Sequence, residues 1–173
     1  MKGRTNMSVK VTYFVHGTTT DNEAKLASGW KPGELSEKGK MQARALRDLI
    51  DRDSIDVVFC SDLKRAIDST EIVFENKKQV IIDSRLRECN YGDLDGKHKS
   101  LVVYEDHIDE AFPNGESLLD VEKRMREFVS WLKVNYDGKT YQMYRKLRAV
   151  DSGWKFSKLN VSYENAKDVK ENM

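Results

Sequence analysis

The chain has 173 residues, of which 39% are apolar and 34% are charged, and its 30 basic and 29 acidic residues leave a formal charge of +1. This length suits one domain with a proper core, and the near-neutral charge gives no global field that would attract nucleic acid or an anionic membrane. Two cysteines are too few for a disulfide framework, and the sequence shows no secretory signal or membrane-spanning apolar run. We therefore expect one domain over residues 1–173, located in the cytoplasm.

The first strand and the first helix are predicted from apolar periodicity. Apolar residues alternate over residues 9–15, which predicts a strand that enters a covered sheet. Ser36 then has the character of a helix N-cap, and an apolar stripe at helical spacing continues to Ile50. Gly39 weakens this helix slightly because glycine has a low helix propensity.

The remaining elements follow in the same alternating order. The β-branched run of residues 55–60 is typical of a buried parallel strand, and Ser61 just after it can cap a helix that reaches Val73. Residues 79–83 predict a third strand. Residues 84–116 have no sustained period and predict a long loop, a feature that is often functional in a compact domain. Ser117 and the apolar stripe up to Leu132 predict a further helix.

This order of strands and helices indicates an α/β fold, with a mainly parallel sheet between two helical layers. Ligands of such sheets bind beyond the carboxyl ends of the strands. His16 stands at the carboxyl end of the first predicted strand, and Arg65 follows the second strand at the same edge of the sheet. We therefore expect the two side chains to converge.

Several short segments occur in an order that resembles a known family. Together they resemble the histidine phosphatase superfamily, which has a phosphoglycerate mutase-like three-layer α/β/α fold, and the nearest likeness is to phosphatases of the α-ribazole phosphatase type. The segments are "HGTTTDN" (16–22), "SGW" (28–30), "LSEKGKMQA" (35–43), "SDLKRA" (61–66), "LRECNYG" (86–92) and "FPNGES" (112–117).

The resemblance implies a role for each matching residue. His16 would be the nucleophile that forms a phosphohistidine, since an imidazole can be neutral near pH 7 and is a good leaving group afterwards. Arg65 would hold phosphoryl oxygens with its fork of donors, and Glu88 would protonate the leaving alkoxide and then help water attack. The positions that would line the substrate pocket are Asn22, Ser28, Gly29 and Tyr91, with Arg87 as an extra anion contact.

Each residue also has a purely structural interpretation when it is taken alone. A histidine after a strand is usually structural, Arg65 would be a solvated helix charge, and Glu88 a surface carboxylate. Only their membership of the set favours catalysis. His98 and His107 match no motif, and no second His, Cys or carboxylate stands with them at ligand spacing. We therefore expect neither a metal nor another cofactor.

Two departures from the family stand out. The family has an arginine immediately before the nucleophile, where this chain has Val15. Its second pocket histidine follows a buried strand that should begin near Thr140, but here the count reaches Lys146 or Leu147, so residues 141–173 look divergent. Other cations (Arg145, Lys146, Arg148 or Arg87) could replace the lost charge, the protein could be a degenerate phosphate binder, or the tail could be scrambled, as by a frameshift. A sheet without this strand would keep an open edge, which suggests a homodimer.

The sequence thus predicts a phosphomonoesterase that acts on a small phosphorylated metabolite through a phosphohistidine, and the two departures leave open a reduced activity. The first alternative is a catalytically degenerate pseudophosphatase that only binds phosphate. The second is phosphotransfer of the phosphoglycerate mutase type, and the short segment between Gly92 and Asn114 favours an open phosphatase pocket over an enclosing mutase pocket. A third class, an interaction protein that acts through its basic tail, rests on composition alone.

Overall fold

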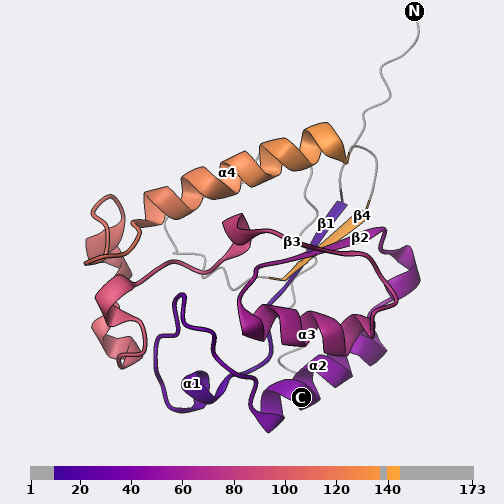
Figure 1. Cartoon of the computed structure of the whole chain (residues 1–173), viewed down its shortest axis with the longest axis horizontal. Coiled ribbons are helices and arrows are strands. Elements are labelled where there is room, and N and C mark those ends of the chain that lie inside the picture. The colour runs from indigo at the N-terminus through magenta and orange to yellow at the C-terminus, as the bar shows by residue number, and fades with distance from the viewer. Residues whose placement is uncertain (1–9, 137–139, 145–173) are drawn as a thin grey trace, which may run out of the picture.

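A parallel sheet between two layers of helices forms the architecture of the computed structural model, which describes residues 10–136 and 140–144. The sheet has four strands in the order β1-β4-β2-β3, and all pairs are parallel. Helices α2 and α3 lie on one face and α4 on the other (Figure 1), which confirms the predicted three-layer α/β/α fold. The strands are β1 (Lys10–Phe14), β2 (Val57–Cys60), β3 (Val80–Ile82) and β4 (Thr140–Tyr144), and the helices are α1 (Thr20–Glu23), α2 (Glu37–Leu49), α3 (Lys64–Phe74) and α4 (Leu118–Asn135).

The helix starts agree with the sequence signals in two cases of three. Ser36 caps α2 through the backbone N–H of Gly39, and Ser117 forms a reciprocal capping box with Asp120 at the start of α4. Ser61 was predicted to cap the helix after β2, and that prediction is wrong. The N-cap of α3 is Leu63, which offers no side-chain hydrogen bond, so this helix depends on tertiary packing for its start.

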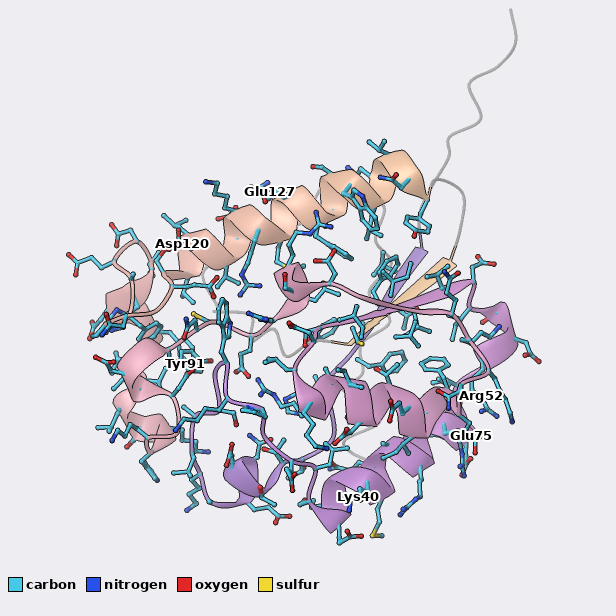
Figure 2. All side chains as sticks on the ribbon, in the orientation of Figure 1. Lys40, Arg52, Glu75, Tyr91, Asp120 and Glu127 are labelled. Carbon is cyan, nitrogen blue, oxygen red and sulfur yellow. The ribbon has the colours of Figure 1, made fainter. Side chains whose placement is uncertain are left out.

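Strand β2 divides the core between the two faces of the sheet. Because side chains alternate along a strand, Val58 and Cys60 pack with α2 and α3, whereas Val57 and Phe59 pack with α4. All four are buried, which explains why the segment has an unbroken apolar sequence. Side chains fill the space on both faces of the sheet (Figure 2).

Strand β4 corrects the expectation that the family pattern ends near Thr140. Thr140–Tyr144 pairs with β1 on one side and β2 on the other, with Gln142 in register with Thr12 and Val58. The polar sequence hid this strand because its pairing uses backbone N–H and C=O groups that every residue here supplies. The strand lies between β1 and β2, so the missing strand on which the homodimer argument depended is present in the described part of the chain. The homodimer itself stays a prediction. The remaining predicted tail residues, from Arg145 onward, lie outside the described residues.

The long loop predicted over residues 84–116 is observed, and it contains short 3-10 turns instead of helices or strands. Helix α1, a single turn, was not predicted from the sequence. Within the described residues no helix combines the length and apolarity that a membrane span requires. The 3-10 turns are η2 (Ser84–Leu86), η3 (Gly92–Leu94), η4 (Lys99–Leu101) and η5 (Tyr104–His107), and η1 (Arg52–Ser54) lies between α2 and β2.

Candidate active site

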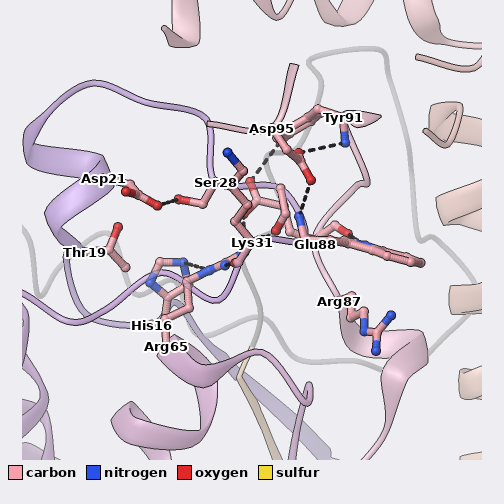
Figure 3. Close-up of polar contacts among 12 residues, drawn as sticks. His16, Thr19, Asp21, Ser28, Lys31, Arg65, Arg87, Glu88, Tyr91 and Asp95 are labelled. Atoms are coloured by element: carbon pink, nitrogen blue, oxygen red, sulfur yellow. Dashed lines mark hydrogen bonds and ion pairs between the residues drawn. The ribbon is translucent and has the colours of Figure 1, made fainter. Parts of the chain in front are cut away.

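His16 lies just beyond the carboxyl end of β1, and its side chain is buried. Its Nδ1 lies 2.7 Å from the carbonyl oxygen of Gly17. Because a carbonyl only accepts, Nδ1 carries the proton, and Nε2 has a lone pair. The Nε–H of Arg65 donates to this Nε2 over 3.2 Å. The imidazole is therefore neutral, with the nitrogen that can act as a nucleophile turned towards a buried cation (Figure 3).

The loop that carries His16 is fastened to α2 and α3. The backbone N–H of Gly17 donates to Ser69 Oγ at 3.1 Å, and Ser69 in turn donates to the carbonyl of Arg65 at 2.7 Å. Gly39 of α2 faces the same loop, where a Cβ would lie 2.0 Å from the carbonyl oxygen of Thr18. The glycine that weakened the predicted helix is thus required by a close approach of two backbones.

Arg65, in the first turn of α3, is almost fully buried, with 1% of its surface exposed. Besides His16, its guanidinium donates from Nη1 to the carbonyl of Lys31 and from Nη2 to the carbonyl of Gly29, both over 2.7 Å. Nη2 also pairs with Glu88 Oε2 at 3.0 Å. A buried cation needs such compensation, and this one is held in a fixed orientation between the histidine and the carboxylate.

Glu88 follows β3 and reaches Arg65 with one carboxylate oxygen. The other oxygen, Oε1, accepts from the phenol of Tyr91 at 2.9 Å, and a further hydroxyl contact of 2.9 Å joins Tyr91 to Tyr104. Burial strongly raises the pKa of Tyr91, and the negative charge of Glu88 adds to this effect. The phenol therefore stays protonated and donates to the carboxylate.

Trp30 and Asp95 connect the loop that contains Gly29 to the main chain at Glu88 and Tyr91. The indole N–H of Trp30 donates to the carbonyl of Glu88 at 2.8 Å, while Asp95 accepts from the backbone N–H groups of Trp30 and Tyr91. Burial raises the pKa of the Asp95 carboxyl, an effect that these two backbone hydrogen bonds oppose. Gly29 has a φ of +49°, and a Cβ there would lie 1.6 Å from Asp95 Oδ1, so only glycine fits.

Asn22 lies in α1, and Ser28 lies in the loop that follows it. The hydroxyl of Ser28 donates to Asp21 at 3.1 Å, and Asn22 Oδ1 accepts from the backbone N–H of Thr19 at 3.1 Å as part of the cap of α1. Neither makes a direct hydrogen bond to His16 or Arg65 among the described contacts. Their side chains shape the loop that holds Gly29.

Arg87 points to a different neighbourhood. It forms a two-pronged ion pair with Asp62, with Nε 2.6 Å from Oδ1, and its guanidinium lies 4.5 Å from the ring centre of Trp30. This pair lines a cavity of about 450 Å³ together with Leu63 and Ile67. The hydrogen bond from Arg87 lowers the pKa of Asp62, although burial opposes this, so the carboxylate is charged. Arg87 is thus already paired with an anion of the protein.

Val15 occupies the position where the family has an arginine, and 45% of its surface is exposed. It adds no donor to the site. The candidates for replacement charge at Arg145, Lys146 and Arg148, like the expected position of the second histidine, lie outside the described residues.

Sequence reasoning missed several members of the site. The carbonyls of Gly29 and Lys31 bind Arg65 through the main chain, which leaves no side-chain signature. Tyr104 lies in the loop without a period, and Asp95 was not distinguished from the surface acids around it. Among the described residues, no His, Cys, Asp and Glu side chains are grouped as three or more metal ligands.

Comparison with known sequences identifies the family. Residues 13–144 match the model of the histidine phosphatase superfamily (branch 1). A 2,3-bisphosphoglycerate-dependent phosphoglycerate mutase of Streptococcus pyogenes serotype M5 (strain Manfredo) is 40% identical over 98 residues. That alignment covers 53% of this chain and 42% of the mutase, so the chain spans less than half of the length of the curated relatives it matches.

Two solved structures extend the comparison. The α-ribazole phosphatase from Shigella flexneri superposes with a TM-score of 0.67 and 28% identity, over 77% of this chain and 71% of that protein. A mycobacterial glucosyl-3-phosphoglycerate phosphatase, solved as a complex with VO3, gives a TM-score of 0.69 and 26% identity, over 77% and 73%. Phosphatases and mutases thus both occur among the similar proteins.

Proposed function

The chain belongs to the histidine phosphatase superfamily, and from this we propose that it is a phosphomonoesterase that hydrolyses a small phosphorylated metabolite through a phosphohistidine on His16. One observation carries the proposal. The unprotonated Nε2 of His16 faces the guanidinium of Arg65, and the same guanidinium is paired with Glu88, so nucleophile, cation and acid form one continuous chain of contacts of 3.2 and 3.0 Å.

In the first half-reaction the lone pair of His16 Nε2 attacks phosphorus, and the bond from phosphorus to the ester oxygen breaks. Arg65, which donates to Nε2 in this structure, turns its Nε–H to a phosphoryl oxygen as the new N–P bond forms. Glu88, which accepts from Arg65 as a carboxylate in this structure, enters this step as the carboxylic acid once Arg65 has turned to the phosphoryl group. It gives its proton to the departing alkoxide, and the alcohol leaves. The Gly17 carbonyl keeps the Nδ1 proton in place and stabilises the positive charge on the ring.

In the second half-reaction water attacks the phosphohistidine. The Glu88 carboxylate takes a proton from the water, the N–P bond breaks, and inorganic phosphate leaves while His16 returns to its neutral form. We assign Asn22, Ser28, Gly29 and Tyr91 to the walls of the substrate pocket. Arg87 is the least supported member of the set, since Asp62 occupies its guanidinium.

The test compares wild type with the variants His16→Ala and His98→Ala. His98 is an exposed histidine whose ring contacts Ser100, which makes it a matched control. We expect wild type and His98→Ala to hydrolyse p-nitrophenyl phosphate equally and His16→Ala to be inactive. Intact mass after rapid acid-free quenching should show a phosphoryl adduct that is absent from His16→Ala. Equal slow hydrolysis by all three proteins, with no adduct, would overturn the proposal.

Mutase-type phosphotransfer is the second candidate, and the 40% identity to the streptococcal mutase favours it. The fate of the phosphohistidine separates the two. In a phosphatase the adduct decays by release of inorganic phosphate at a rate that added 3-phosphoglycerate does not change. In a mutase, 3-phosphoglycerate accepts the phosphoryl group and bisphosphoglycerate appears.

Exposed Val15 is the observation that favours the pseudophosphatase alternative, because an arginine there would have supplied a further donor to the phosphoryl group. A protein of that kind would bind inorganic phosphate at this site, yet it would form no adduct on His16. Phosphate binding measured by titration calorimetry, beside the adduct measurement, distinguishes this outcome from a hydrolase.

A further inference from the structure

A second arginine, which no sequence motif marked, holds the main chain before and at Glu88. Arg124, on the inner side of α4, donates from Nη1 to the carbonyls of Arg85 and Arg87 at 2.6 and 2.7 Å, and from Nη2 to the carbonyl of Glu88 at 3.0 Å. These carbonyls belong to the first residues of the long loop after β3. One side chain therefore fixes three points of the backbone that ends in the proposed acid.

Glu116 binds both Arg124 and the main chain after Glu88. Its Oε1 accepts from Arg124 Nε at 2.8 Å, and its Oε2 accepts both from Arg124 Nη2 at 2.9 Å and from the backbone N–H of Asn90 at 2.9 Å. Arg124 thus has an acceptor for each of the five N–H groups of a guanidinium. The backbone is held before Glu88 by the arginine and after it by the glutamate.

The surroundings of the pair make these contacts strong. The side chains of Arg124 and Glu116 are only 14% and 17% exposed, so water competes weakly for the donors and acceptors. The arginine stands on the longest helix of the described chain, whose other residues Phe128 and Leu132 pack against the sheet. Glu88 therefore takes its position from the α4 layer, whereas His16 and Arg65 take theirs from the α2 and α3 layer.

We propose that Arg124, with Glu116, is a positioning residue that holds the Glu88 carboxyl where it can protonate the leaving group. It touches no substrate and acts only through the backbone of residues 85–90. This inference rests on the proposed function, because it assigns Glu88 the role of acid. It predicts that loss of Arg124 weakens one chemical event, the proton transfer, more than phosphoryl binding or attack by His16.

The basicity of the leaving group distinguishes positioning from a merely structural role. An alkoxide needs a proton as it departs, whereas p-nitrophenolate leaves readily without one, so a displaced acid slows alkyl esters selectively. The variant Arg124→Lys keeps the charge but loses the fork of donors that spans the three carbonyls. Arg126→Lys is the matched control, since Arg126 is on the same helix, 75% exposed, and paired only with Glu122 among the described residues.

Wild type, Arg124→Lys, Arg126→Lys and Glu88→Gln are assayed on glycerol 2-phosphate and p-nitrophenyl phosphate, at a temperature where circular dichroism shows each to be folded. For Arg124→Lys we expect kcat to fall by about 30- to 100-fold on the alkyl ester and by less than about threefold on the aryl ester. Glu88→Gln should show the same selectivity, and adding Arg124→Lys to it should cost little more, because both changes remove one event.

Three results would overturn the inference. These are equal losses on both esters, no loss beyond that of Arg126→Lys, or additive effects of Arg124→Lys and Glu88→Gln. Failure of the proposed function looks different, because wild type would then hydrolyse neither ester and form no phosphoryl adduct. In that case Glu88 is not an acid, and the positioning role of Arg124 is wrong as well.

Discussion

The site has two halves, the acid half around Glu88 and the phosphoryl half around His16, and they differ in how many supporting contacts they have. Around Glu88 the supports are numerous, since Tyr91 donates to the carboxylate while Arg124, Glu116 and Trp30 hold the backbone at and beside it. Around His16 the tautomer is fixed and Arg65 is in place, but the neighbouring Val15 faces solvent where the family has an arginine. The difference teaches that the proposed acid and the proposed phosphoryl site are supported largely by different residues, with the Arg65–Glu88 ion pair as the link between them.

If the acid half is complete, removing its carboxyl should give the largest loss of any change outside the nucleophile. We expect Glu88→Gln to lower kcat for an alkyl phosphate by roughly 10² to 10⁴, the usual contribution of a positioned acid. Initial rates over a range of substrate concentrations measure this, and KM should change far less than kcat. Asp93→Asn, an exposed acid in the same loop, serves as the control. A similar loss of kcat in Glu88→Gln and Asp93→Asn would contradict the proposal that Glu88 is a specifically positioned acid.

If the phosphoryl half lacks a donor, supplying one should raise activity. We expect Val15→Arg to increase kcat/KM by about tenfold, or about 1.4 kcal/mol of transition-state stabilisation, less than a fully preorganised donor provides. Val15→Lys brings the charge without the fork and should gain less. Hydrolysis of p-nitrophenyl phosphate reports the effect, since this ester depends little on Glu88. A gain that is the same in Val15→Lys and Val15→Arg would point to charge alone.

The smallest effect is expected at the start of α4, which supports the acid half from a distance. Ser117→Ala removes the N-cap next to Glu116 and should lower the free energy of unfolding by about 1 kcal/mol, or the Tm by about 2 to 4 °C, with selectivity between esters unchanged. Differential scanning calorimetry checks the first statement and the two-ester assay the second. A change of ester selectivity in this variant would show that the halves are less separate than proposed.

This cap also has a pH dependence. Hydrogen bonds from the backbone and side chain of Ser117 lower the pKa of Asp120, against the raising effect of burial. A carboxyl with a lowered pKa in the folded state stabilises the fold above its unfolded pKa, and this contribution is lost as the pH falls through the folded pKa. The difference in Tm between wild type and Ser117→Ala should therefore narrow in acid.

Much of the layout could be predicted from sequence because it depends on patterns of side chains. The alternation before His16, the capping serines of α2 and α4, and the order of strands and helices led to the fold and to the meeting of His16 with Arg65. The contacts of Arg124 could not be predicted, since three of its acceptors are backbone carbonyls that any residue would provide. Strand β4 was missed for the same reason, as its place in the sheet is secured by backbone pairing.

The facing glycines of the nucleophile loop and α2 bear on how variation in this protein should be interpreted. A Cβ on Gly17 would meet the carbonyl of Gly39 at 2.4 Å, and a Cβ on Gly39 would meet that of Thr18 at 2.0 Å, so any larger residue drives the loop and the helix apart. In a saturation mutagenesis screen scored by activity, Gly39 would tolerate substitution as poorly as His16. A helical glycine that takes no part in the chemistry would then be as intolerant of substitution as a catalytic residue.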